Sequence, residues 1–330
     1  MDFRTRIQIT EPDIFIKHST ELMLFGSCFS ENIGIKLLQN KFKADVNPFG
    51  ILYNPFSVSN SIKRLISGEH FSERDLVCYN GMYHSFMHHG HFSDTDKQVC
   101  LEKIMERFER AAGIIRNAGL FLITFGTAYI YKWKDNGMLV SNCHKFPACR
   151  FQRSRLQVEE IVEEWNEVIT QILSINPDSK FIFTVSPVRH WKDGAHENQV
   201  SKSILHLAVD SLRNGFAGSV YYFPAYEVMI DELRDYRFYE DDMIHPSPFA
   251  IDYIWHLFAE AFFSCETREV NREWEQIRKA IFHRPLHPTA RSYKMFLEQT
   301  LQKLELFSDR HPEIECEEER ALLKEKLYRS

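Results

Sequence analysis

Two short segments, far apart along the chain, carry side chains of the types used in nucleophilic catalysis. The first is FGSCFS (residues 25–30), in which Ser27 and Cys28 stand between an apolar run and a helical pattern. The second holds Asp242 and His245, three positions apart. At this spacing the carboxylate can bind one ring nitrogen of the imidazole and leave the other free as a general base. The two segments together predict a nucleophile and its base.

The first segment is typical of a strand, a tight turn and a helix in succession. Gly26 permits a close turn, and the side chains after it would lie at a helix N-terminus, where backbone N–H groups favour an anion. A thiol at Cys28 is therefore expected to have a lowered pKa. The alternative interpretation is structural, with Ser30 or Ser27 as the helix N-cap and Cys28 as a small buried side chain.

The elements that must position these residues follow an alternating pattern. Short apolar runs that end near Gly, Pro or Ser indicate strands covered on both faces. These runs are residues 22–25, 120–125, 180–185 and 219–223. Helical patterns lie between or after them, at residues 30–39, 97–115, 158–175, 200–212 and 246–263. Alternation of this kind predicts a doubly wound α/β sheet, whose ligand crevice lies beyond the carboxyl ends of its strands.

The character of the chain changes near Cys265. No strand-like run follows, and three helices separated by Pro-containing connections are expected at residues 271–282, 290–306 and 313–327. We therefore predict a catalytic domain over residues 1–264 and a helical extension over 265–330. Packing or homodimerisation is the expected role of the extension.

Composition narrows the class of protein. The 330 residues include 40 Lys and Arg against 46 Asp and Glu, so the net charge of −6 argues against a general nucleic-acid binder. No apolar run is long enough for a membrane span, and charges interrupt the N-terminal segment where a signal peptide would need an apolar stretch. The seven cysteines are scattered and form no C-x-x-C pair, which favours reduced thiols in the cytoplasm. No dinucleotide or P-loop motif appears, so no cofactor is expected.

A histidine-rich segment offers one possible metal site. His84, His88 and His91 have near-helical spacing that would suit zinc, but Gly90 interrupts the segment and no acidic or cysteine partner lies nearby. We favour a loop that lines the cleft and predict no metal. His144 has two open interpretations, a substrate contact or a satisfied loop histidine.

The SPVRHW segment (186–191) follows the third predicted strand and should open onto the same crevice. Arg189 is suited to bidentate binding of a carboxylate or phosphate, and Trp191 to stacking on a sugar ring. The alternative is an arginine paired with a core aspartate beside a packed tryptophan.

At this point the sequence resembles a known family. The blocks that carry the resemblance are GSCFS, NPFGILYNPFS, ITFGTAYIY, NCHKFP, SPVRHW and ELRDYRFYEDDMIHPS. They occur in the order expected for the GSCFA domain family, which is similar to the SGNH (GDSL-like) hydrolases, and they cover about residues 3–264. The resemblance implies a flavodoxin-like three-layer αβα fold and chemistry on carbohydrate esters or by acyl transfer.

The resemblance also implies roles for individual residues. The SGNH pattern Gly-Asp-Ser-x-Ser/Thr places Cys28 at the nucleophile position, while a shift by one would give that role to Ser27. In the last block Asp242 orients the imidazole and His245 is the base.

The oxyanion hole departs from the superfamily pattern. Gly50 matches the glycine of the second block, but the third block reads Gly126-Thr127-Ala128 where a Gly-x-Asn is usual. Loss of one such donor costs about 3 kcal/mol of transition-state stabilisation. Either Thr127 or Asn47 substitutes for the missing amide, or the chemistry is not ordinary ester hydrolysis.

Three functions are compatible with these residues. The first is an esterase that acts on an acylated carbohydrate or small molecule through a covalent acyl-enzyme. The second is an acyltransferase with the same residues, for which acyl-CoA or an acyl sugar would be the co-substrate. The third is a ligand-binding module that kept the fold without catalysis.

Overall fold

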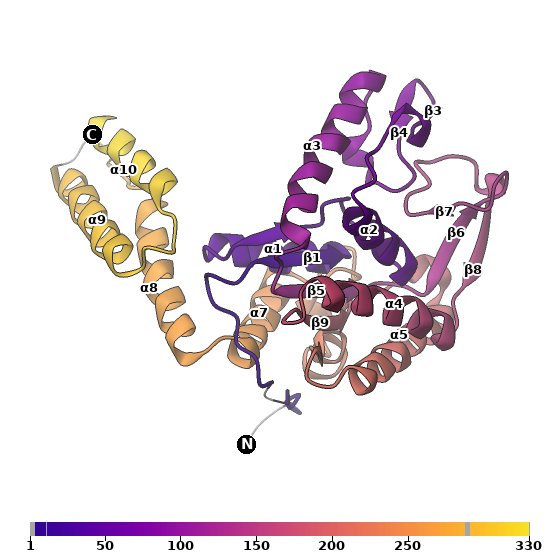
Figure 1. The fold of residues 1–330 in the computed structure, drawn as a ribbon. Coiled ribbons are helices and arrows are strands. Elements are labelled where there is room, and N and C mark those ends of the chain that lie inside the picture. The colour runs from indigo at the N-terminus through magenta and orange to yellow at the C-terminus, as the bar shows by residue number, and fades with distance from the viewer. Residues whose placement is uncertain (1–3, 11, 288–290, 330) are drawn as a thin grey trace.

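A computed structural model of the protein describes residues 4–10, 12–287 and 291–329. Five parallel strands form its central sheet, in the order β10-β9-β5-β1-β2 (Figure 1). Their bounds are β1 Leu22–Gly26, β2 Ala44–Val46, β5 Leu120–Phe125, β9 Lys180–Val185 and β10 Val220–Tyr222. All four apolar runs of the sequence therefore form strands of this sheet, as predicted.

Two helical layers cover the sheet, because successive residues of a buried strand face opposite sides. Phe121, Ile123 and Phe125 of β5 belong to one core cluster, whereas Leu120 and Leu122 belong to another. The first cluster includes side chains of α2 (Pro55–Ser67), α3 (Lys97–Ile115), α4 (Val158–Ile175) and α5 (Ala195–Gly215). The second includes side chains of α1 (Cys28–Gln39) and α7 (Pro248–Phe262). This arrangement confirms the predicted three-layer αβα fold.

The strand order defines where the winding changes direction. From β1 the chain first adds β2 on one side and then adds β5, β9 and β10 in turn on the other. This is the flavodoxin-like order, as predicted. The carboxyl ends of β1 and β5 form its topological switch point, where α/β sheets bind their ligands.

Some elements did not follow from the apolar pattern. They are helix α2, edge strand β2 and two small antiparallel sheets. One sheet contains β3 (Val77–Tyr79) and β4 (Met82–His84). The other contains β7 (Leu139–Val140), β6 (Tyr129–Trp133) and β8 (Phe151–Arg155), in that order. Helix α1 also begins earlier than its predicted start at Ser30. The short helix α6 (Ala225–Glu227) follows β10.

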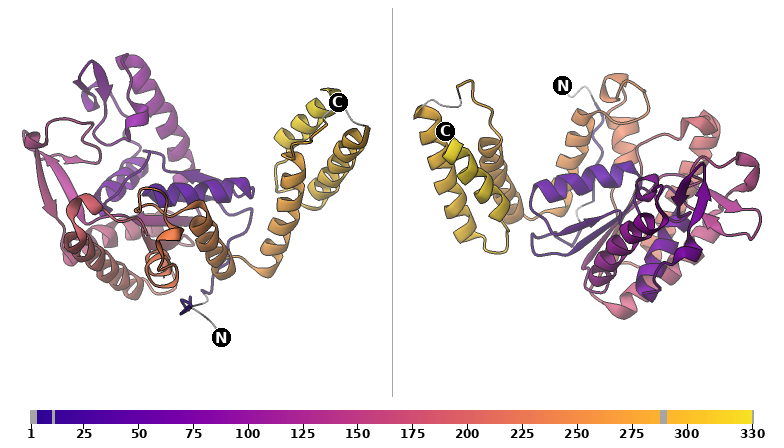
Figure 2. Two further views of the ribbon diagram at one scale, coloured as in Figure 1. Left: turned by 180° about the vertical axis from the view of Figure 1, so that it is seen from behind. Right: turned by 90° about the horizontal axis from the view of Figure 1, so that it is seen from above.

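The C-terminal helices are α8 (Cys265–Ile281), α9 (Arg291–Arg310) and α10 (Glu317–Arg329). They confirm the predicted helical extension, although Ala290, the predicted start of the second helix, lies outside the described residues. These helices share a separate core cluster and stand to one side of the sheet (Figure 2). The division into two domains near residue 264 stays a prediction. No helix in the described part of the chain is both long and apolar enough to cross a membrane.

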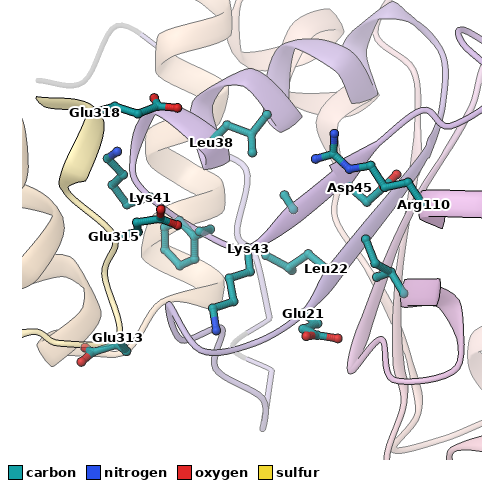
Figure 3. Close-up of a pocket in the computed structure, with 13 residues that line it drawn as sticks. Glu21, Leu22, Leu38, Lys41, Lys43, Asp45, Arg110, Glu313, Glu315 and Glu318 are labelled. Carbon is teal, nitrogen blue, oxygen red and sulfur yellow. The ribbon is translucent and has the colours of Figure 1, made fainter. Parts of the chain in front are cut away.

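Polar contacts join the extension to the segment between α1 and β2. Lys41 forms an ion pair with Glu319 at 2.6 Å, and the Trp274 indole donates to the Gln39 carbonyl at 2.8 Å. A pocket of about 390 Å³ lies at this junction. Figure 3 shows Lys41 and Lys43 on its α1–β2 side and carboxylates from residues 313–318 on the other. Because Leu22 and Ala44 begin β1 and β2, this pocket lies at the amino ends of the strands, opposite the switch point.

Candidate active site at the carboxyl edge of the sheet

The turn after β1 has the predicted strand–turn–helix form. A Cβ at Gly26 would lie 2.2 Å from the Thr124 carbonyl oxygen, so β1 and β5 can meet here only with glycine at this position. Ser27 is buried and is the N-cap of α1, and its Oγ accepts the Phe29 N–H at 3.3 Å. Cys28, the first residue of the helix, is half-buried. The Ser27 hydroxyl is thus used in capping, while the Cys28 thiol forms no disulfide.

The expectation of a lowered pKa at Cys28 is wrong for this structure. Burial raises the pKa of the Cys28 thiol, and it outweighs the backbone N–H of Phe29 and the nearby positive charge of Lys202, both of which lower that pKa. Glu31, one helical turn along, raises it further. A helix N-terminus lowers the pKa of a thiol, whereas desolvation of the thiolate raises it. At Cys28 desolvation has the larger effect.

Asn47 lies against this turn from the neighbouring strand. Its Oδ1 accepts the Gly26 N–H at 3.0 Å, and its own N–H donates to the Leu24 carbonyl at 2.9 Å. That bond to Oδ1 fixes which end of the amide is the donor. Asn47 Nδ2 is buried and has no hydrogen-bond partner within the part of the chain that the structure describes. An unpaired amide donor therefore lies at the turn that carries the thiol.

The Gly50 backbone is close to Asn47 but is not a free donor. Its N–H donates to the Asn47 carbonyl at 2.7 Å. Gly50 has a positive φ of 77°, and a Cβ there would lie 2.3 Å from the Cβ of His89. The assignment of Gly50 as an oxyanion donor therefore needs correction, because its N–H closes a tight turn instead.

The N–H groups after β5 are also engaged. Gly126 and Thr127 both donate to the Tyr53 carbonyl, at 2.8 Å and 2.9 Å. The Thr127 hydroxyl lies 3.2 Å from the Ser201 hydroxyl. These bonds correct the expectation that Thr127 could substitute for the missing amide, and they also engage the N–H of Gly126, the other oxyanion or substrate-binding candidate in this block. Of the residues predicted for that role, Asn47 alone carries an unpartnered donor.

The predicted carboxylate–imidazole pair is formed. Asp242 Oδ2 lies 2.5 Å from His245 Nδ1, which leaves Nε2 of the ring free. The other oxygen, Oδ1, accepts the N–H groups of Ile244 and His245, both at 2.9 Å. These hydrogen bonds from His245 and Ile244 lower the pKa of Asp242 to about 2. The carboxylate is thus ionised and holds one orientation of the ring.

Arg189 holds the loop that carries this pair. Its Nη2 donates to the Met243 carbonyl, and its guanidinium lies 5.1 Å from the ring centres of both Trp191 and Tyr239. Neither sequence interpretation anticipated this contact, since Arg189 pairs with a backbone carbonyl rather than with a core aspartate. Trp191 is 51% exposed, so about half of its surface is open to solvent.

Three residues near the turn escaped the sequence analysis: Tyr53, His190 and Lys202. The Tyr53 and His190 rings meet edge to face at 5.6 Å, and a Cβ at Gly126 would lie 3.2 Å from His190 Nε2. Burial, with the nearby charge of Lys202, lowers the pKa of His190 to about 3, so the ring is neutral. His190 lies in the SPVRHW segment, where the sequence pattern pointed only to its neighbours Arg189 and Trp191.

The histidine-rich segment forms a packed group. His88 is buried, stacks on Phe49 at 4.6 Å and lies 2.9 Å from the Ser85 hydroxyl. His144 Nε2 lies 2.8 Å from the Ser85 carbonyl, and its ring stacks on His84 at 4.5 Å. The structure thus gives His144 the contacts of a satisfied loop histidine. Within the described residues, no three His, Cys, Asp or Glu side chains converge as metal ligands.

The thiol and the Asp–His pair share no hydrogen bond. Cys28 follows β1, whereas the Asp242–His245 loop is held by Arg189 beyond the end of β9, the second strand along. The two strands flank β5, and Tyr53 and His190 meet between them. Catalytic hydrogen bonds are often long in unliganded enzymes and tighten when substrate binds. The residues of the candidate site therefore lie near the carboxyl ends of β1, β5 and β9.

Fold and site together define a three-layer α/β protein with a thiol at the switch point and an Asp–His pair at the same edge of the sheet. The sequence model of the GSCFA family matches residues 21–258, and this chain belongs to that family. The model described as "GSCFA domain protein, C-terminal domain" matches residues 274–329.

Other comparisons add little. No curated protein matches the sequence. Among solved structures, a Clostridium thermocellum family 3 carbohydrate esterase is similar to this chain, with 11% sequence identity and a TM-score of 0.33 over 77% of this chain and 97% of the esterase. At that TM-score the similarity carries no argument about this protein.

Proposed function

We propose that this GSCFA protein is an acyl-transfer hydrolase that cleaves an ester of a carbohydrate or small molecule through a thioester on Cys28. The observation that carries the proposal is the placement of a half-buried thiol and the unpartnered Asn47 amide at one turn, at the switch point of the sheet. A nucleophile needs a donor fixed where negative charge develops. This pairing supplies both.

The reaction divides into two balanced steps. In the first, His245 takes the thiol proton, the Cys28 sulfur bonds to the ester carbonyl carbon, and the C–O bond breaks as the alcohol leaves with that proton. In the second, His245 takes a proton from water and the oxygen of that water bonds to the thioester carbonyl carbon. The C–S bond then breaks, the Cys28 sulfur takes the proton back from His245, and the acid leaves. Asp242 stabilises the imidazolium in both steps. Asn47 Nδ2 donates to the oxyanion of each tetrahedral intermediate.

Transfer to another acceptor is a second candidate, and the nature of the nucleophile favours it. A thioester on Cys28 has the same functional group as an acyl-CoA, so exchange between them costs little free energy. The same residues would then pass the acyl group to an alcohol or amine instead of water.

The test is p-nitrophenyl acetate turnover by the wild type, Ser27→Ala, Cys28→Ala and His245→Ala. We expect Cys28→Ala and His245→Ala to lose about 100-fold or more in rate, because each removes a group that reacts. Ser27→Ala should keep the activity and lose about 1 kcal/mol of stability, because it removes a helix cap.

Matched controls exclude a general effect of losing a thiol or an imidazole. Cys149→Ala and His256→Ala change exposed residues and should keep wild-type rates. Equal rates in all variants, or rates at the buffer blank, would refute the esterase proposal. Acetyl-CoA with an added alcohol or amine then distinguishes transfer, which consumes the thioester, from binding alone.

A further inference from the structure

Lys202 of α5 is a fully buried lysine that pairs with no carboxylate of the described residues. Its exposed fraction is 0%, and its Nζ donates to the carbonyls of Gly126 and Ser186, both at 2.7 Å. An ammonium has three protons, so these two bonds leave one unused. Burying an unpaired charge costs several kcal/mol, and two neutral carbonyls offset that cost only in part.

The position of this lysine relates it to the thiol. Gly126 and Ser186 follow the ends of β5 and β9, and Cys28 follows the end of β1, which pairs with β5. Adjacent strands lie about 4.8 Å apart, so the ammonium is anchored one strand from the turn. The two groups influence each other, since a charged Lys202 favours the Cys28 thiolate and the thiolate favours the charged lysine.

We propose that Lys202 is an electrostatic positioning residue for Cys28, whose buried ammonium favours the Cys28 thiolate and ties the ends of β5 and β9 beside it. This inference rests on the proposed role of Cys28 as nucleophile. The charge of Lys202 lowers the pKa of the Cys28 thiol and so offsets part of the effect of burial. This inference goes beyond the esterase assignment because it names the source of the activating charge.

The other groups around the pair are accounted for. Glu31 and Tyr53 face the Cys28 thiol, and as anions both would oppose the thiolate. The Tyr226 ring lies 5.5 Å from Lys202 Nζ, and His190 and His206 feel its charge. Burial, together with that charge, lowers the pKa of each of these histidines, to about 3 for His190 and about 4 for His206.

Two opposing effects act on the pKa of Lys202 itself. Burial lowers its pKa to about 7, and interaction with Cys28 works in the opposite direction. Because such coupling is reciprocal, removal of either group should shift the titration of the other by the same amount.

The experiment is the rate of iodoacetamide alkylation at Cys28 between pH 5.5 and 10, read from the mass of the peptide that contains it. In Lys202→Met we expect the alkylation rate at pH 7 to fall about tenfold and the apparent thiol pKa to rise by about one unit. Lys202→Arg, which restores a cation, should recover most of the loss. The control is Lys180→Met, since Lys180 also donates to a carbonyl, that of Gly218, and should leave the profile unchanged.

A purely structural role predicts a different result. If Lys202→Met folds and its alkylation profile superimposes on that of the wild type, the electrostatic proposal is wrong. If that variant does not fold, the reciprocal measurement decides, because Cys28→Ser alters only a half-buried side chain. In ¹³C-lysine-labelled protein, with the Lys202 signal assigned through Lys202→Arg, its pKa should fall in Cys28→Ser, and an unchanged pKa would refute the coupling.

This readout is independent of turnover. Alkylation reports the thiol itself, so a protein without esterase activity still tests the Lys202 inference. Conversely, an active enzyme whose Cys28 profile ignores Lys202 would leave the esterase proposal intact.

Discussion

At this site neighbouring residues have different roles, one structural and the other the proposed chemical role. Ser27 caps α1 with its hydroxyl, while Cys28 one residue later presents its thiol. The two ends of the Asn47 side-chain amide differ in the same way. Its Oδ1 accepts the Gly26 N–H, whereas its Nδ2 has no partner among the described residues. An unsatisfied buried donor is costly in a native structure. In the proposed mechanism this donor binds an oxygen that arrives with the substrate.

Substitution of Asn47 tests this at the scale of one atom. Asn47→Asp keeps the acceptor for the Gly26 N–H and replaces the unpaired donor by an acceptor. Aspartate also tolerates the positive φ of 46° at this position. We expect kcat for p-nitrophenyl acetate to fall 10²–10³-fold with little change in KM, because the lost bond forms only in the transition state.

The control for this variant is a measurement that the turn after β1 still folds. A melting temperature near that of the wild type would show that the turn is intact. Wild-type kcat in a folded Asn47→Asp protein would contradict the role of the Nδ2 donor.

At the scale of elements, separate segments converge on the carboxyl edge of the sheet and are held by backbone hydrogen bonds. The segment after β2 binds both β1 and β5, since Leu52 donates to the Gly26 carbonyl and the Tyr53 carbonyl accepts from Gly126. The loop after β9 contributes Arg189, which holds the loop before α7 through the Met243 carbonyl. Loss of one tie should therefore affect a neighbouring loop.

Arg189→Met should loosen the loop that carries Asp242 and His245. We expect kcat to fall about tenfold or more, because a base must be held within hydrogen-bond reach of its proton. Hydrogen exchange of the amides at residues 242–245 should become faster. Cys28 alkylation should be unaffected, because the thiol lies on another element.

Arg237→Met is the matched control, because Arg237 is an exposed arginine that pairs with Asp235 in the same region. It should keep wild-type kcat and exchange rates. If Arg189→Met leaves both quantities unchanged, Arg189 does not position the loop.

Local patterns account for the elements that sequence could predict. The apolar runs at β5 and β9 are buried on both faces, and their continuous apolar pattern directly predicts strands. Helix α2 was missed even though Asn54 caps it, Pro55 begins it and Gly68 follows it, since its face toward the core is partly made of serines. Strand β2 has only three residues, which is too short for a periodic signal.

The site was predictable only where its residues are close in sequence. Asp242 and His245 form their pair within one turn, and Ser27 and Cys28 adjoin a recognisable strand. Lys202 gave no signal, because its hydrogen bonds reach carbonyls 76 and 16 positions away. The engagement of Gly50 also depends on turn geometry that residue type alone does not encode.

At the scale of the whole molecule, the two ends of the sheet have different surroundings. The carboxyl ends carry the thiol, the Asn47 amide and the Asp–His pair. The amino ends of β1 and β2 adjoin the C-terminal helices and the pocket of Figure 3, where Lys41 pairs with Glu319. The topology thus places the candidate site away from the extension, at the position where flavodoxin-like sheets bind ligands.

The central claim is that an acyl group passes through Cys28, and trapping that intermediate tests it most directly. Wild-type protein mixed with p-nitrophenyl acetate and quenched in acid within milliseconds should carry one acetyl group on the peptide that contains Ser27 and Cys28. Neutral hydroxylamine should remove it, since it is a thioester, and Cys28→Ala should not acquire it. Turnover with an acetyl group that resists neutral hydroxylamine, or with no acetyl on this peptide, would contradict the account.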